Sequence, residues 1–173
     1  MTSLTSRPGA SALPTPYDLV APHVPPQDRT KRDLLAASRL VEQRALHSGA
    51  HTVLVTFQDK RHLSPRSRAA YARLARSGTR VHAFARGLVS DYRPDTDGLV
   101  TVALMPGDAV VQEWDIVVLG DTGGSAFVAR DLEPETAVDG GDLERRFAWA
   151  RTDDPALVRE AAAALLGRLP QQR

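Results

Sequence analysis

The chain has 173 residues, of which 42% are hydrophobic and 25% are charged, and its formal net charge at pH 7 is +1. This composition is typical of a globular protein with one main domain, and the length is sufficient for a hydrophobic core. The sequence has no cysteine, which excludes disulfides and thiolate chemistry. It also has no apolar run long enough to span a bilayer and no secretory signal in its first 21 residues. These features predict a cytoplasmic protein without membrane contact.

The charges are unevenly distributed along the chain. Residues 60–86 contain eight Lys or Arg and no acid, whereas residues 87–173 contain sixteen Asp or Glu and eight Arg. Such an arrangement can give one basic and one acidic surface, which would attract anions, a nucleic acid or a second copy of the protein. A solvated helix face explains the same pattern and is the preferred interpretation, because Arg is usually exposed.

The proline-rich start of the chain is predicted to be a disordered tail. Residues 1–28 contain six of the twelve prolines, only three charged residues and no periodic apolar pattern. Such residues bury too little apolar surface to offset an ordering entropy of about 1 to 2 kcal/mol per residue. The alternative is a short extended segment in which Tyr17, Leu19 and Val20 pack on the domain. The folded domain is then predicted to span residues 29–170.

A helix, a buried strand and a second helix follow in order. Thr30 is expected to cap a helix over residues 31–47, in which apolar residues recur at intervals of three and four. Residues 52–57 are typical of a strand covered on both faces. Ser64 and Pro65 begin a second helix over residues 65–77, and a strand over residues 80–85 follows. This unit predicts that strand 52–57 is internal and parallel to strand 80–85.

The second half of the chain is predicted to consist mainly of strands. They are expected over residues 99–104, 114–119, 125–130 and 145–152, with a hairpin turn at residues 121–124 and a final helix that begins at Pro155. The fold class is therefore α/β, a single compact domain whose mixed, mostly parallel sheet of about five or six strands packs with three main helices.

A polar stretch after the buried strand is the predicted site, because open α/β sheets bind ligands at the carboxyl ends of their strands. It consists of Gln58, Asp59, Lys60, Arg61 and His62. Lys60, Arg61 and Arg66 are predicted to hold an anionic group, assisted by the free amides and positive dipole end of the second helix. Asp59 is expected to orient one arginine. An acid–base pair of Asp59 and His62 is the less favoured interpretation.

Recognisable catalytic and cofactor motifs are absent. The sequence has no HExxH metal motif, no G-x-S-x-G elbow, no P-loop and no G-x-G-x-x-G. The stretch Gly140–Glu144 is superficially similar to the GGDEF signature of diguanylate cyclases and is interpreted as a polar turn. Trp114 and Trp149 are interpreted as core residues in preference to cavity walls. No catalytic residue and no metal ligand is predicted, and the cofactor is unknown.

Several short motifs nevertheless occur together in a distinctive order. They are Phe57-Gln-Asp-Lys-Arg-His62 with Pro65, Arg66, Tyr71 and Leu74, then Glu113-Trp-Asp-Ile-Val-Val-Leu119, Val128-Ala-Arg-Asp131, and Arg145-Arg-Phe147 before Thr152-Asp-Asp154 and an Ala/Leu-rich helix. This order resembles the DICT domain, a sensory domain named for its occurrence beside diguanylate cyclases and two-component systems. The resemblance covers residues 30–169.

The resemblance implies a non-enzymatic input module of bacterial signal transduction that detects a small ligand or a light-linked signal. Because no output domain is evident in the sequence, it implies a stand-alone form that acts on a separate kinase, cyclase or transcription regulator. By position, the residues that match the most distinctive motifs are Phe57, Asp59, Arg61, His62, Arg66, Trp114, Asp131 and Arg146.

Two other functions stay open at the level of sequence. One is a protein-interaction adaptor without a ligand, and the other is an enzyme of unrecognised type. A nucleic-acid partner is less favoured, because the basic run has few interleaved aromatic residues, and a homodimer is compatible with the charge pattern.

Overall fold

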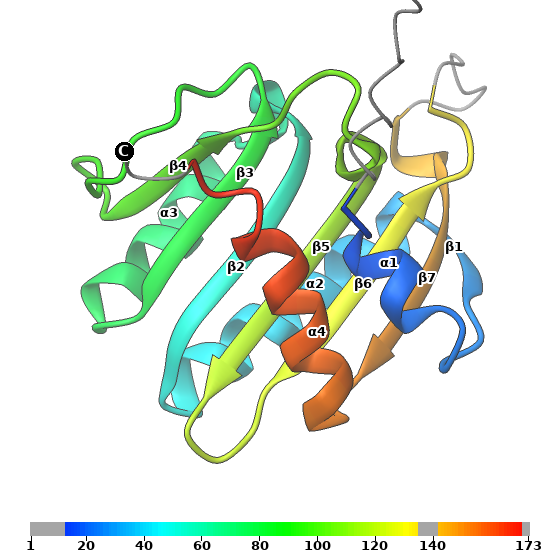
Figure 1. Cartoon of the computed structure of the whole chain (residues 1–173), viewed down its shortest axis with the longest axis horizontal. Helices are drawn as coiled ribbons and strands as arrows, with labels where there is room; N and C mark the ends of the chain where they lie inside the picture. The colour runs from blue at the N-terminus through cyan, green and yellow to red at the C-terminus, as the bar shows by residue number, and fades with distance from the viewer. Residues whose placement is uncertain (1–12, 135–141, 171–173) are drawn as a thin grey trace, which may run out of the picture.

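The computed structural model describes residues 13–134 and 142–170, which form a single α/β domain around one mixed sheet (Figure 1). Seven strands make up this sheet in the order β1-β7-β6-β5-β2-β3-β4. Their bounds are β1 Gln27–Thr30, β2 Ala50–Asp59, β3 Arg80–Arg86, β4 Leu99–Ala103, β5 Glu113–Gly120, β6 Ser125–Asp131 and β7 Arg146–Thr152. The four α-helices in these residues are α1 Pro16–Val20, α2 Lys31–His47, α3 Pro65–Arg76 and α4 Pro155–Leu166.

The strand β2 is internal and parallel to β3, as predicted. It lies between β3 and β5, and Val53 pairs with Val81 in the parallel ladder. The helix α3 connects β2 to β3, which gives the strand–helix–strand unit expected from the sequence. The prediction succeeded because the strand consists of apolar and β-branched residues, a pattern typical of a strand with neighbours on both edges and cover on both faces.

The prediction of a mostly parallel sheet of five or six strands is wrong. Only the pairs β2–β3 and β3–β4 are parallel, whereas β1–β7, β2–β5, β5–β6 and β6–β7 are antiparallel. Parallel neighbours need a long crossover, usually a helix, and no α-helix separates β5, β6 and β7 in the described chain. The additional strand is β1, a short and largely exposed edge strand.

The predicted disordered tail over residues 1–28 differs from the structure for residues 13–28. A capping box formed by Thr15 and Asp18 begins α1, and Val20 at its end is fully buried. The strand β1 pairs with β7. These residues are ordered by distant contacts, which local composition does not reveal. Residues 1–12 lie outside the described part of the chain, and the predicted domain limits of 29–170 stay a prediction.

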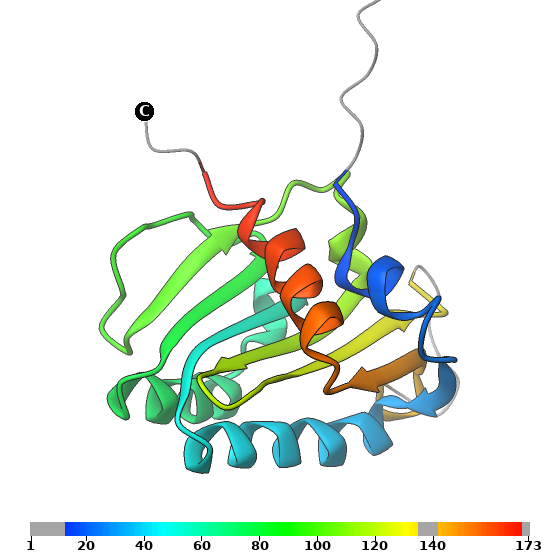
Figure 2. The ribbon, with the colours of Figure 1, turned by 60° about the horizontal axis from the view of Figure 1, so that its bottom comes forward.

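The helices form a layer on each side of the sheet. Figure 2 shows α2 and α3 on one face and α1 and α4 on the other. The cluster between the sheet and the first pair includes Leu34, Tyr71 and Phe127, and the cluster on the opposite face includes Phe84 and Leu165. The sheet therefore separates two hydrophobic cores. The carboxyl end of β2 leads into α3, which lies on the α2–α3 side of the sheet.

Helix-start signals in the sequence correspond to helix starts in the structure. Thr30 accepts a hydrogen bond from the backbone N–H of Asp33 in a capping box, and α2 begins at Lys31. Ser64 caps α3 by accepting a hydrogen bond from the backbone N–H of Ser67, with Pro65 in the first turn. Of the stretch 140–144, the first two residues lie outside the described part and Asp142–Glu144 form a 3₁₀ turn. Within the described residues, no helix has the length and apolar character needed to cross a membrane.

Candidate functional site

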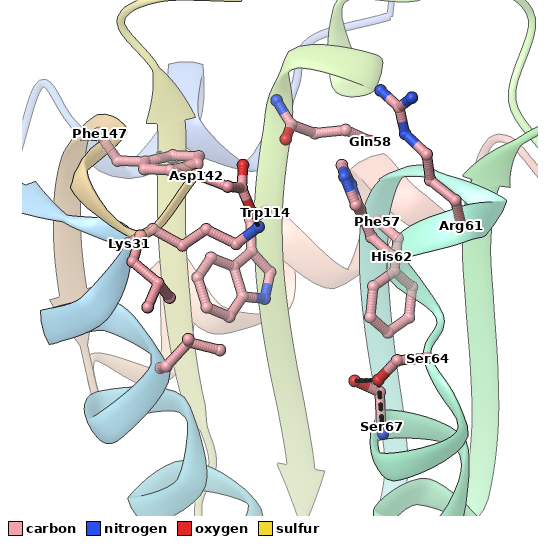
Figure 3. Close-up of a pocket in the computed structure, with 12 residues that line it drawn as sticks. Lys31, Phe57, Gln58, Arg61, His62, Ser64, Ser67, Trp114, Asp142 and Phe147 are labelled. Carbon is pink, nitrogen blue, oxygen red and sulfur yellow. Dashed lines mark hydrogen bonds and ion pairs between the residues drawn. The ribbon is translucent and has the colours of Figure 1, made fainter. Parts of the chain in front are cut away.

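A cavity of about 320 Å³ lies between α2, the turn from β2 into α3, and strands β5 and β7 (Figure 3). We call it the aromatic pocket. Its apolar walls are Leu35, Phe57, Trp114, Leu143 and Phe147, and its polar lining residues are Lys31, Gln58, Arg61, His62, Ser64, Ser67 and Asp142. The pocket thus combines an apolar interior with a polar margin, as small-molecule sites usually do.

The aromatic walls are held in place by other rings. Phe57 packs edge-on against Tyr71 with ring centroids 6.0 Å apart. Trp114 packs edge-on against Phe127 at 5.6 Å and against Phe147 at 6.1 Å. Side chains alternate along β5, so Trp114 lies on the α2–α3 side of the sheet. Because these contacts join the pocket walls to core rings, the fold itself holds the walls in place.

Most polar groups of the aromatic pocket are already paired. Lys31 donates to Asp142 in an ion pair. The side-chain amide of Gln58 donates to Asp131 at 2.9 Å, and the hydroxyl of Ser64 donates to that of Ser67 at 3.1 Å. Burial alone would raise the pKa of Asp142, but the hydrogen bond and charge of Lys31 outweigh it and lower this pKa. Asp142 is therefore ionised at neutral pH.

Three polar side-chain groups of the pocket have no hydrogen-bond partner among residues 13–134 and 142–170. They are the indole N–H of Trp114, the imidazole of His62 and the guanidinium of Arg61. The side chain of Arg61 is 75% exposed, and its Nε lies 4.0 Å from Asp59 Oδ1. Burial lowers the pKa of His62, and the nearby charges of Lys31 and Arg61 lower it further, so its ring is neutral at pH 7.

A second, more polar cavity of about 210 Å³ adjoins the aromatic pocket and shares Gln58, Arg61, His62 and Asp142 with it. Asp59 accepts a hydrogen bond from the backbone N–H of Arg61 at 3.1 Å, which lowers its pKa, and another from Arg86 at 3.3 Å. Asp131 accepts from Gln58 and from Arg145. The carboxylates of this cavity are thus matched by arginines.

The structure brings six of the nine predicted site residues to these two cavities. Phe57, Arg61, His62 and Trp114 line the aromatic pocket, and Asp59 and Asp131 line the adjoining cavity. The sequence interpretation places Trp114 in the core. In the structure Trp114 packs against the core and also lines the aromatic pocket. The ligand-binding role of all six stays a prediction.

The other three predicted residues line neither cavity. Lys60 lies over Gly87. Arg66 is exposed on α3, and Arg146 donates to Asp28 at 2.7 Å across the β1–β7 edge. The predicted cluster of Lys60, Arg61 and Arg66 is therefore not assembled around a cavity, because the 3₁₀ turn Lys60–His62 directs consecutive side chains differently.

Sequence reasoning missed the contribution of α2 and of the segment before β7. Lys31 and Leu35 reach the pocket from the first turns of α2, and Asp142 and Leu143 reach it from the 3₁₀ turn before β7. The one signal for it in the sequence is Leu35, an apolar residue beside the core stripe of α2.

The opposite face of β5 carries a buried acidic pair. Glu113 and Asp115, on either side of Trp114 in sequence, are fully buried. Burial raises the pKa of both carboxyls, and the charge of Glu113 raises that of Asp115 well above its ordinary value. Thr56 donates to Asp115 at 3.3 Å.

Glu113 also fastens the N-terminal helix to the sheet. It accepts hydrogen bonds from Arg130 at 2.7 Å and from the backbone N–H of Tyr17 at 3.2 Å. Arg130 in turn donates to Asp18 at 2.8 Å, and its guanidinium carbon lies 4.3 Å from the ring centroid of Tyr17. We call Tyr17, Asp18, Glu113 and Arg130 the N-terminal clamp. The pocket wall Trp114 and the clamp residue Glu113 are thus consecutive residues of one strand.

Metal ligands are not clustered in the described part of the chain. No group of three or more His, Asp or Glu side chains there is arranged to hold a metal ion.

Comparison with known proteins gives a family match and likenesses to solved structures. The model of a family described as "Sensory domain in DIguanylate Cyclases and Two-component system" matches residues 17–132. No curated protein matches the chain. A polyphosphate kinase from Porphyromonas gingivalis is similar in structure, with a TM-score of 0.55 and 11% identity over 82% of this chain. The chain spans only 22% of that kinase, and at this identity the likeness shows the fold alone.

Proposed function

The chain belongs to the DICT family of sensory domains, and from this membership we propose that it is a non-enzymatic sensor that binds a small ligand in the aromatic pocket. The family description names sensing and no reaction. The observation that carries the assignment of the pocket is the combination of preformed aromatic walls with three polar groups that lack partners in the described chain.

The dimensions and chemistry of the pocket support a small-molecule ligand. Its volume of about 320 Å³ is at the lower end of the range of roughly 300 to 1,000 Å³ typical of such sites. The apolar walls stabilise binding by removing apolar surface of the ligand from water. Hydrogen bonds from the ligand to Trp114, His62 and Arg61 would fix its orientation.

The output is proposed to be a separate protein, namely a kinase, a cyclase or a transcription regulator. Family membership supports a signalling partner of this kind. The proposal predicts that ligand binding changes the affinity of the sensor for that partner, because a signal is passed only when ligand and partner binding are thermodynamically coupled.

Ligand binding is tested with the purified protein. Native mass spectrometry detects molecules that copurify, and a metabolite library is then screened for compounds that raise the melting temperature. The screen is repeated with Trp114→Leu and with Trp149→Leu, an aromatic residue on the same face that does not line the pocket. We expect the ligand-induced shift to vanish only in W114L. A ligand that stabilises both variants equally, or no ligand at all for the wild type, would contradict the proposal.

An interaction adaptor is the second candidate, and the outer face of α2 favours it. Leu40 is 58% exposed there, beside Arg39 and with Arg44 one turn further on, and neither arginine forms an ion pair with another described residue. This candidate predicts a partner whose affinity falls in Leu40→Gln and does not change with any small molecule, as measured by calorimetry.

A further inference from the structure

The polar groups that lack partners in the aromatic pocket indicate the class of ligand, an inference that rests on the proposed function. We propose that the ligand is a planar aromatic acid of one or two fused rings, with its ring against Trp114 and its carboxylate at Arg61.

The apolar part of the pocket fits an aromatic ring. Phe57, Trp114 and Phe147 form its walls, and the indole of Trp114 lies across the cavity from Phe57 and His62 (Figure 3). Aromatic rings prefer offset or edge-to-face contacts with other rings, and the ring-to-ring packing of Trp114 already has this geometry. A volume of about 320 Å³ accommodates a compact ring system rather than a long chain.

The groups without partners are predominantly hydrogen-bond donors. The indole of Trp114 and the guanidinium of Arg61 can only donate, and the neutral ring of His62 can donate through one nitrogen. The ammonium of Lys31, the other cationic donor at the margin, is paired with Asp142. The end of the ligand that meets these groups must therefore present acceptors.

The charge at the margin favours one negative charge on the ligand. The lining residues include two cations, Lys31 and Arg61, and one carboxylate, Asp142, while His62 is neutral. The ion pair of Lys31 with Asp142 leaves Arg61 as the pocket cation whose guanidinium donates no hydrogen bond to a carboxylate of the described residues, although its Nε lies 4.0 Å from Asp59 Oδ1. Its nearest carboxylate, Asp59, is shared with Arg86. The guanidinium lies on the side of the cavity opposite Lys31 (Figure 3), where it can meet a carboxylate without breaking the ion pair of Lys31 with Asp142.

Three probes separate the elements of this inference: 2-naphthoate, its neutral amide 2-naphthamide, and the aliphatic acid octanoate. Their affinities are measured by calorimetry on wild-type protein, Arg61→Gln and Arg73→Gln. Arg73 is an exposed arginine of α3 that does not line the pocket and serves as the matched control. We expect 2-naphthoate to bind wild type at least about ten-fold more tightly than either other probe. R61Q should abolish the advantage of the acid over the amide, and R73Q should retain it.

Tryptophan fluorescence locates the bound probe. The protein has two tryptophans, and only Trp114 lines the pocket. Quenching by 2-naphthoate should persist in Trp149→Phe and disappear in Trp114→Phe.

Three results would overturn the inference. Equal affinity for 2-naphthoate and 2-naphthamide would refute the need for an anionic group. Equal affinity for 2-naphthoate and octanoate would refute the need for an aromatic ring. No binding of any probe to the wild type would refute the whole ligand class. None of these results decides the proposed function, which fails only if the copurification and library screens also yield no ligand that depends on Trp114.

Discussion

Asp115 gives the clearest pH-dependent prediction at the scale of single residues. Its folded-state pKa is raised above the ordinary value of 3.8 by burial and by the charge of Glu113. The fold therefore binds this proton more tightly than the unfolded chain does. The stabilisation is complete below the unfolded pKa and is lost as the pH rises through the folded pKa.

Asp115→Asn keeps the shape and removes the titration. We expect the free energy of unfolding of D115N, relative to wild type, to increase from about pH 4 to about pH 8, measured by urea unfolding. Asp28→Asn is the control of opposite sign, and its change falls below about pH 4, because the hydrogen bond from Arg146 lowers the pKa of Asp28 below its ordinary value of 3.8. A difference between D115N and wild type that is the same at every pH would show that Asp115 does not titrate in this way.

Tyr71 is a second buried residue, and its hydroxyl forms a hydrogen bond at the edge of the core. Its ring is buried and its hydroxyl donates to Glu42 at 2.9 Å, while burial raises the pKa of Glu42. Tyr71→Phe should cost about 1 to 3 kcal/mol, because a partly buried carboxyl loses its donor. The double variant with Glu42→Leu should recover part of this loss. Chemical denaturation measures both, and independent, additive effects would refute the coupling.

At the scale of elements, the N-terminal clamp should determine how firmly α1 is held. The helix has only five residues, too few to be stable alone. Arg130→Met removes the hydrogen bonds to Asp18 and Glu113 while keeping the packing volume. We expect amide exchange over residues 15–24 to accelerate by about ten-fold or more, while β2 and β3 retain their protection. Arg29→Met, on the exposed edge strand, is the control that should leave α1 unchanged.

Elements with local start signals were predictable from the sequence, and elements ordered by distant contacts were not. The start of α2 follows from Thr30 and Asp33, which lie three residues apart. The helix α1 depends on Glu113 and Arg130, about a hundred residues away along the chain. The prediction of a mostly parallel sheet was wrong for the same reason, because the apolar pattern of a strand does not specify which strand lies beside it.

The part of the site that lies at the end of one strand was predictable from the sequence. The part that depends on how distant elements pack against each other was not. Phe57 and His62 follow from the strand–loop–helix pattern. Lys31 and Asp142 reach the same cavity only because α2 packs beside the turn after β2 and the chain before β7 returns to it. Nothing in the local sequence around either residue specifies that encounter.

At the scale of the whole molecule, the sheet should make the two cores energetically independent. Val41 belongs to the α2–α3 core and Val158 to the α1–α4 core, and both are almost fully buried. Each Val→Ala substitution should cost about 2 kcal/mol, and the double variant should equal the sum within about 0.5 kcal/mol. Thermal or urea unfolding measures this. A clear departure from additivity would mean that the sheet transmits packing changes between its faces.

The alternation of β5 also restricts how this protein can change during evolution. Trp114 faces the aromatic pocket, while Glu113 and Asp115 face the opposite core. Because consecutive side chains of a strand point to opposite faces, deleting or inserting one residue here would place a carboxyl in the pocket wall and an indole beneath α1. Related chains are therefore expected to differ in β5 by substitution and to conserve its length, and an insertion scan should find this strand among the segments least tolerant of a length change.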